Sequence, residues 1–213
     1  MNKGGDDIIS SFINLDSEKR VNILNAAMKE FSQKGYKNAS TNEIVKSANI
    51  SKGLLFHYFS NKKSLFFYLL EYTGEVFLTD FFDKLSSEKT DMITRWRQIV
   101  LLKIELIRKY PDLYNFLLSA ALDESAEIKQ EFERKSKSIL DDSYKRVLTN
   151  IDTSVFKEGL DEKRVSDMII WVIQGFSNNE LEKLKRNNLA YDVNAIMADF
   201  DIYLDLLKNI FYK

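Results

Sequence analysis

The sequence predicts an all-α protein of about nine helices, with a small N-terminal three-helix domain followed by a larger helical domain. Three observations lead to this prediction. The 213 residues include only one proline and seven glycines, which permits long helices and disfavours an architecture of strands and turns. Hydrophobic residues make up 45% and charged residues 30%, as is ordinary for a globular protein. Apolar residues recur at steps of three and four, which is the helical period.

The composition excludes several classes of protein. There is no cysteine, which removes disulfides, thiolate metal sites and cysteine nucleophiles. No apolar run approaches the ~20 residues that span a bilayer, and the acidic start MNKGGDDIISS is not a secretory signal. We therefore expect a cytoplasmic protein with no membrane partner.

The sequence also lacks the common catalytic motifs. His57 is the only histidine, and no acid or hydroxyl is spaced to serve it as a base. There is no glycine-rich phosphate loop, no HExxH and no Glu-x-x-His pair. We expect no enzymatic activity, no metal and no cofactor, and measurable turnover of any substrate would reverse that expectation.

Charge is unevenly distributed along the chain. Among residues 1–65, ten basic residues oppose six acidic ones, a net charge of +4, whereas 21 basic and 26 acidic residues give −5 for residues 66–213. A basic head on an acidic body is typical of a small DNA-binding domain attached to another domain. Scatter in surface charge is the alternative explanation for a difference of this size.

The N-terminal elements can be placed in order. Residues 1–16 form a loose arm whose apolar residues could pack on the body: Ile8, Ile9, Phe12, Ile13 and Leu15. A helix over 17–34, capped by Asp16 or Ser17, carries one apolar stripe and ends at Gly35. The stripe consists of Val21, Leu24, Ala27, Met28 and Phe31.

Two short helices follow. Ser40 and Glu43 form a capping box that opens the first one, with Ile44, Val45 and Ala48 facing inward. Asn49 and Ile50 make a turn, and Ser51 caps the second helix, in which Leu55 and Phe59 face inward. Asn61 or Ser60 then caps a long helix that begins near Lys62.

The rest of the chain reads as five more helical stretches: 90–109, 111–124 after Pro111, 126–149, 161–186 and 192–212. We place the domain boundary between residues 65 and 66, with a DNA-binding domain over 1–65 and a helical effector-binding and dimerisation domain over 66–213.

Two short helices joined by a tight turn make a helix-turn-helix, whose second helix enters the major groove. Gly53 lets that helix approach DNA closely because it has no side chain. Lys52 and Lys62 can meet phosphates, Lys52 can also meet a guanine edge, and Leu54 can touch a thymine methyl group. The remaining candidate contacts are His57 and Tyr58 to phosphate or bases, and Ser40, Thr41 and Asn42 to phosphate.

Residues 17–65 resemble the N-terminal domain of TetR-family transcriptional regulators. The resemblance rests on Phe31, Gly35, Tyr36, Thr41, Ile44, Ser51, Gly53, Leu55, Phe56, Tyr58, Phe59, Asn61, Lys62 and Leu65. That family usually has tyrosine where Phe56 stands, so a phosphate contact from position 56 is replaced by packing on a sugar or a thymine methyl group. The resemblance implies a DNA-binding regulator and places His57 at a variable, DNA-facing position.

Tight DNA binding calls for two copies of such a head, and the last helix offers an apolar seam for pairing. The seam consists of Val193, Ile196, Met197, Phe200, Tyr203, Leu204, Leu207, Ile210 and Phe211, and we assign all but Met197 and Ile210 to a dimer interface. The helix before it is apolar nearly all round. We therefore expect a homodimer with a four-helix interface, as the resemblance also implies. The alternative is that both stripes serve only the subunit's own core.

The resemblance, and not residue spacing, implies a small-molecule effector. We expect an apolar or aromatic molecule bound near Trp96, Phe116 and Trp171, since aromatic side chains between helices can line a pocket. The resulting hypothesis is a homodimeric repressor released from a palindromic DNA operator by its ligand. An activator, or a ligand-independent architectural or occlusion protein using the same head, is the alternative.

Overall fold

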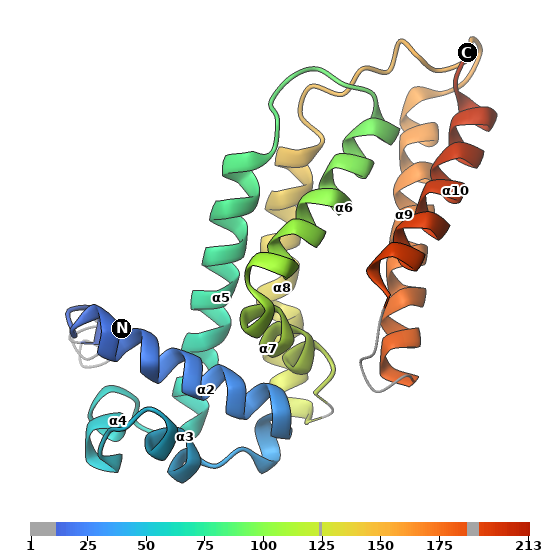
Figure 1. Cartoon of the computed structure of the whole chain (residues 1–213). Coiled ribbons are helices and arrows are strands. Elements are labelled where there is room, and N and C mark those ends of the chain that lie inside the picture. The colour runs from blue at the N-terminus through green and yellow to red at the C-terminus, as the bar shows by residue number, and fades with distance from the viewer. Residues whose placement is uncertain (1–11, 124, 187–191) are drawn as a thin grey trace. The chain divides into compact units, whose positions relative to one another are not determined.

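A computed structural model describes residues 12–123, 125–186 and 192–213 (Figure 1). In these residues the chain forms nine α-helices and no strand, which confirms the predicted fold class. The helices are α2 (Ser17–Asn38), α3 (Thr41–Ser47), α4 (Lys52–Tyr58), α5 (Lys62–Lys84), α6 (Met92–Lys109), α7 (Pro111–Ala121), α8 (Ala126–Val147), α9 (Glu162–Arg186) and α10 (Val193–Phe211). In this part of the chain no helix is long and apolar enough to cross a membrane.

The helices divide into two compact units. The first, unit 1, consists of Met1–Asp80 and Ile107–Ser138, and the second, unit 2, of Phe81–Leu106 and Ile139–Lys213. The expected boundary at 65/66 falls inside α5, so it stays a prediction about function. By packing, α7 and the first half of α8 belong with the N-terminal helices.

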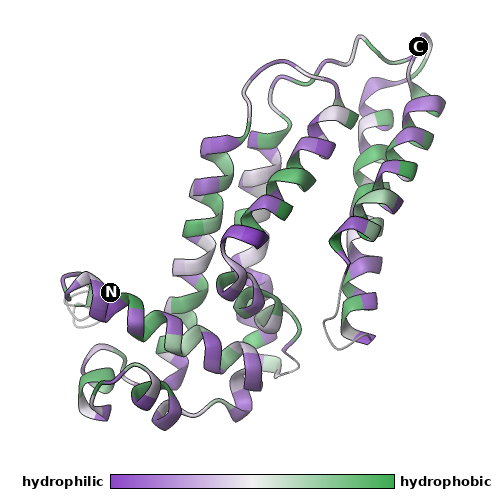
Figure 2. Cartoon of the chain, in the orientation of Figure 1, coloured by the Kyte–Doolittle hydropathy of each residue, from purple (hydrophilic) through white to green (hydrophobic). Residues whose placement is uncertain are grey.

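The core of unit 1 is aromatic. Phe31, Phe66 and Phe116 are fully buried, and their ring centroids lie 5.0–6.2 Å apart. They join α2, α5 and α7 because each helix turns its apolar side inward, and apolar and polar residues alternate along the ribbons accordingly (Figure 2). Four of the five predicted stripe residues of α2 are buried. Val21 is exposed instead, because the neighbouring Ile23 takes the inward position.

The predicted stops and caps are largely present. Gly35 has φ +69°, a left-handed conformation that interrupts α2, although one more turn continues to Asn38. The carboxylate of Asp16 accepts the amide of Lys19 at 3.1 Å and so caps α2. Asn61 caps α5 reciprocally, because its side-chain oxygen accepts the Ser64 amide at 2.9 Å while the Ser64 hydroxyl accepts the Asn61 amide at 3.2 Å.

The C-terminal residues of unit 2 link two of its helices by hydrogen bonds. The Tyr212 hydroxyl donates to Asp91 at 2.8 Å and accepts the amide of Ile93 at 3.0 Å. Asp91 also caps α6 by accepting the Thr94 amide at 3.0 Å. The end of α10 is thereby tied to the beginning of α6.

Candidate DNA-binding interface

The helix-turn-helix is made by α3, α4 and the turn between them. Asn49 has φ 52°, and the Ile50 amide donates to the Val45 carbonyl at 3.0 Å, so the chain reverses tightly between the two helices. Ile44 and Leu55 are almost fully buried, which fixes the inner faces of α3 and α4 on the core of unit 1. The outer face of α4 is left to make other contacts.

The capping of α4 agrees with the sequence, but that of α3 does not. The Ser51 hydroxyl accepts the Leu54 amide at 3.1 Å, as predicted. The capping box of Ser40 and Glu43 is wrong, because the Ser40 side chain makes no capping hydrogen bond and its amide donates to Glu30 of α2 at 2.9 Å. A carboxylate from another helix thus does what Glu43 was expected to do.

The candidate contact residues on α3 and α4 are mostly exposed. Lys52, Gly53, Phe56 and His57 are exposed on α4, and Leu54 and Tyr58 are half-buried. The Lys52 ammonium lies 5.9 Å from the centre of the Phe56 ring. On α3 and its cap, Asn42 is exposed, and Ser40 and Thr41 are partly exposed.

Gly53 is not required by the chain's own packing. A methyl group built at this position would find its nearest neighbour, the Ser51 hydroxyl, at 4.0 Å, and the backbone at Gly53 has no positive φ. A methyl group would therefore fit within the isolated molecule. Glycine at an exposed, unstrained position points to close approach by another molecule.

Lys62 lies in a different environment from the one predicted. Its ammonium donates to the carbonyls of Lys37 and Ala39, both at 3.1 Å, and lies 4.9 Å from the centre of the Tyr36 ring. These bonds satisfy carbonyls at the end of α2. Two of its three donors are thus engaged in linking α5 to α2, and the expected phosphate contact from Lys62 stays a prediction.

The arm before α2 contributes a buried anchor. Phe12 is 0% exposed, and its ring meets Tyr58 and Phe59 edge-on at centroid distances of 5.3 and 4.9 Å. Tyr68 of α5 lies 5.4 Å away. Packing of the arm on the body was expected, but its contact with the end of α4 was not. Ile8 and Ile9 lie outside the described residues.

The predicted dimer seam needs correction. Phe200, Leu204, Leu207 and Phe211 are buried in the core of unit 2, so they have no exposed surface to give to a partner. Val193 and Ile196 are partly exposed, and Tyr203 is exposed. The sequence could not show which side of the apolar helix faces inward.

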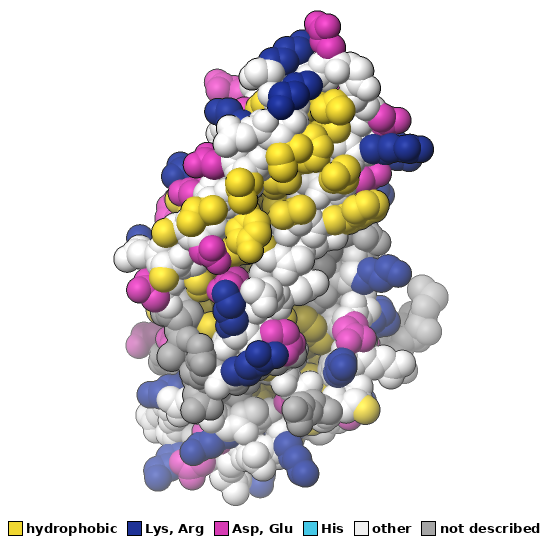
Figure 3. Space-filling model, turned by 90° about the vertical axis from the view of Figure 1, so that its right-hand side faces the viewer, with side chains coloured by type: hydrophobic (Ala, Val, Ile, Leu, Met, Phe, Trp, Pro, Cys, Tyr) yellow, Lys and Arg dark blue, Asp and Glu magenta, His cyan; other side chains and the backbone are white. Residues whose placement is uncertain are grey.

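A second apolar stripe faces outward. Figure 3 shows apolar side chains gathered over the face that α9 and α10 form. Trp171 is 65% exposed and is the most exposed of them. The patch, called the α9–α10 face below, consists of Met168, Trp171, Val172, Ile202, Tyr203, Leu206 and Ile210. The spacing of residues 202, 206 and 210 was visible in the sequence as a helical stripe.

The three candidate effector residues have different surroundings. Phe116 is buried in the core of unit 1, Trp96 is buried in unit 2 next to Tyr144, and Trp171 is on the α9–α10 face. An aromatic effector pocket at these residues stays a prediction. Large aromatic residues serve core packing and exposed patches as readily as ligand sites, so residue type alone does not assign them.

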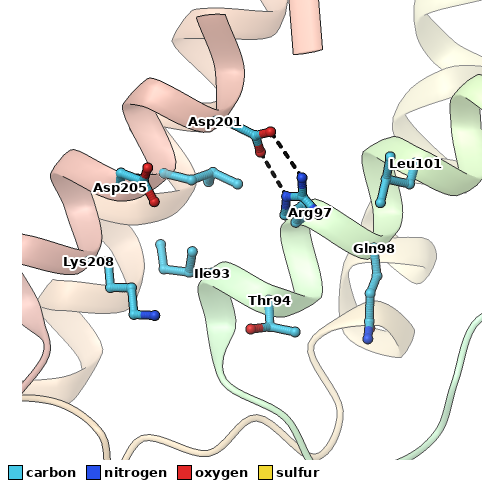
Figure 4. A pocket seen from close by; sticks show the side chains of 9 residues that line it. Ile93, Thr94, Arg97, Gln98, Leu101, Asp201, Asp205 and Lys208 are labelled. Carbon is cyan, nitrogen blue, oxygen red and sulfur yellow. Dashed lines mark hydrogen bonds and ion pairs between the residues drawn. The ribbon is translucent and has the colours of Figure 1, made fainter. Parts of the chain in front are cut away.

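A groove of about 440 Å³ lies between α6 and α10 (Figure 4). Arg97 crosses it and pairs with Asp201 through two hydrogen bonds of 2.8 and 3.0 Å, and this carboxylate raises the pKa of Arg97. Leu101 and Leu204 supply apolar surface, and Lys208 adds a second cation. The described residues include no cluster of three or more metal-ligating side chains.

Comparison with known proteins agrees with this architecture. Residues 23–69 match the model of the family described as bacterial regulatory proteins, tetR family. The chain is 27% identical over 165 residues to the uncharacterized HTH-type transcriptional regulator YuxN of Bacillus subtilis (strain 168), covering 78% of this chain and 54% of that protein. It thus spans about half the length of this curated relative.

Two solved structures have the same fold. A TetR family transcriptional regulator from Chloroflexus aurantiacus J-10-fl superposes with a TM-score of 0.60 at 22% identity, over 96% of this chain and 98% of that one. The transcriptional regulator FadR from Bacillus subtilis, in complex with stearoyl-CoA, gives a TM-score of 0.55 at 22% identity, over 88% and 96% of the two chains.

Proposed function

Since this chain belongs to the TetR family of bacterial regulatory proteins, we propose that it is a repressor that binds a palindromic DNA operator as a homodimer and leaves it on binding a small molecule. That it is a helix-turn-helix transcriptional regulator follows from the family itself. The observation that carries the proposal is the outer face of α4, where Lys52, Gly53, Phe56 and His57 are exposed above a buried inner face.

The proposed contacts follow from this exposure. Lys52 at the beginning of α4 reaches a phosphate or a guanine edge, and Leu54 and Phe56 meet thymine methyl groups or sugars. His57 and Tyr58 donate to phosphate or bases. Ser40, whose hydroxyl makes no capping bond, contacts phosphate together with Thr41 and Asn42.

Dimerisation is proposed to use the α9–α10 face. Exposed apolar patches of this kind mark association surfaces because their burial against a partner removes them from water. A two-fold axis through that face makes it self-complementary and duplicates the DNA-reading head. Two heads reading half-sites about 34–36 Å apart explain how such short helices could select one DNA sequence.

A small-molecule effector is proposed to control DNA binding. The stearoyl-CoA complex of FadR supports it, because a protein of the same fold there holds a small molecule. For this chain we propose an apolar or aromatic effector that prefers one arrangement of the helices and thereby changes operator affinity. An activator, or a ligand-independent occlusion protein, would use the same head.

Selection from random DNA tests the proposal. The full chain is incubated with a pool of random duplexes, bound DNA is sequenced over several rounds, and the complex is sedimented. We expect an inverted repeat and two chains per duplex. Recovery of unrelated sequences in a strongly salt-dependent manner, which is the behaviour of non-specific binding, would contradict it.

Release by ligand is tested separately with the selected duplex. Small-molecule fractions of a cell extract are added to the complex, and operator affinity is measured by fluorescence anisotropy. A fraction that lowers the affinity supports the ligand-released regulator. Affinity that no fraction changes favours the ligand-independent occlusion protein.

A further inference from the structure

A small pocket in unit 2 is lined by basic and hydroxyl side chains. It has a volume of about 290 Å³ and lies where the end of α5, the loop after it, the beginning of α6 and the end of α8 meet. Phe82 and Leu85 supply its apolar wall, and Ser87 and Thr149 are among its polar residues. Arg95 and Arg146 also line it, and no carboxylate does.

Arg95 is a buried cation without an acidic partner. It is 1% exposed, and its two terminal nitrogens donate to the backbone carbonyls of Ser86 and Glu88. Its Nε is buried and meets no acceptor, and no ion pair joins Arg95 to a carboxylate of the described residues. Two carbonyls offset part of the cost of burying this charge, and an anion in the pocket would stabilise it further.

Arg146 brings a second guanidinium to the same pocket. It lies 3.5 Å from the centre of the Phe82 ring, which holds it against the apolar wall. Its side chain is exposed, and within the described residues it has no ion pair. At the rim of the pocket, the side-chain amide of Asn150 donates to the Ser87 carbonyl at 3.1 Å and so joins the segment after α8 to the loop after α5.

We propose that this pocket binds the oxyanion group of a small molecule, a phosphate or a carboxylate. Arg146 pairs with the anion through its planar fork of donors, and Arg95 supplies a fixed positive charge behind it. Phe82 and Leu85 accommodate an apolar portion attached to that group. The pocket belongs to unit 2 and involves none of the DNA-contact residues, so it stands independently of the proposed function.

Titration calorimetry of the full chain tests the proposal. Inorganic phosphate and benzoate are titrated separately in a phosphate-free buffer at constant ionic strength. We expect at least one of them to bind saturably to the wild type. Arg146→Gln should raise that dissociation constant about tenfold or more, because it removes a charge-assisted pair. The anion that binds more tightly shows whether the pocket prefers a phosphate or a carboxylate.

Arg164→Gln is the matched control, because Arg164 is an exposed arginine of the same unit and does not line the pocket. It should leave anion affinity unchanged. Without anion, Arg146→Gln should keep the wild-type operator affinity, which separates this test from that of DNA binding. Absence of saturable binding by both anions, or equal affinity in Arg146→Gln and wild type, would overturn the proposal.

Discussion

Single residues contribute measurably to the stability of the N-terminal helices, and Lys62 is the clearest example. It donates to two carbonyls at the end of α2. Lys62→Ala should lower the free energy of unfolding by about 1–2 kcal/mol, because these carbonyls lose a charged partner. Chemical denaturation measures the change.

Lys63→Ala is the matched control for that measurement. Lys63 is exposed and forms a surface ion pair with Glu127, so its loss should destabilise the protein less than the loss of Lys62. Equal stabilities of the two variants would show that Lys62 does not join α5 to α2.

Phe12 is expected to affect DNA binding without touching DNA. Phe12→Leu keeps an apolar residue in the core but loses the ring contacts to Tyr58 and Phe59 at the end of α4. Operator affinity should fall severalfold while the slope of log affinity against log salt stays the same, because no phosphate contact is removed. Wild-type affinity in this variant would refute the proposed positioning role.

At the scale of elements, two neighbouring residues of α10 separate core from proposed interface. Leu206 is 53% exposed on the α9–α10 face, whereas Leu207 is 6% exposed and packs inside unit 2. Leu206→Asp should give a folded monomer. Leu207→Asp should unfold unit 2, because it buries an unpaired charge.

Sedimentation and circular dichroism distinguish these two outcomes. If Leu206→Asp still sediments as a dimer, the α9–α10 face is not the interface. If Leu207→Asp instead gives a folded monomer, the interface is the seam predicted from the sequence, which includes Leu207.

The stabilisation that Asp91 provides where α6 meets the end of α10 should depend on pH. Burial raises the pKa of Asp91, but hydrogen bonds from Thr94 and Tyr212 outweigh it, so that its pKa lies below the usual carboxyl range. A lowered folded-state pKa means that the stabilisation is complete above a pH of about 4, near the unfolded carboxyl pKa, and is lost as the pH falls through the folded value.

Asp91→Asn removes this titration. The variant should be less stable than the wild type at pH 7, and the difference should narrow as the pH falls below about 4. Denaturant midpoints across that range measure it, with Asp83→Asn, an exposed acid of α5, as the control for loss of one charge. A difference that stays constant with pH would contradict this account of the junction.

For the whole molecule, the sequence predicted the helices well because their signals are local. Gly35, Ser51 and Asn61 each act through backbone atoms within a few residues, so their roles could be read from the chain. The outer face of α4 was predicted for the same reason.

The errors have a common physical origin. Glu30 replaced Glu43 at the cap of α3 because a partner distant in sequence became available only on folding. For the same reason, the bonds from Lys62 to the carbonyls of α2 were not predicted. The orientation of α10 could not be predicted either. With apolar residues on two sides, periodicity identifies the stripes but not the one that the rest of unit 2 covers.

The most direct test of the central claim, that α4 enters the DNA groove, is a size series at Gly53. The affinity of Gly53→Ala and Gly53→Gln for the selected operator is measured beside their melting temperatures. A Cβ at this position would lie 4.0 Å from its nearest neighbour, the Ser51 hydroxyl, and glycine is a poorer helix former than alanine or glutamine, so both variants should melt no lower than the wild type. Operator affinity should fall stepwise with side-chain size, by about tenfold or more for Gln. Unchanged affinity across the series would contradict the account.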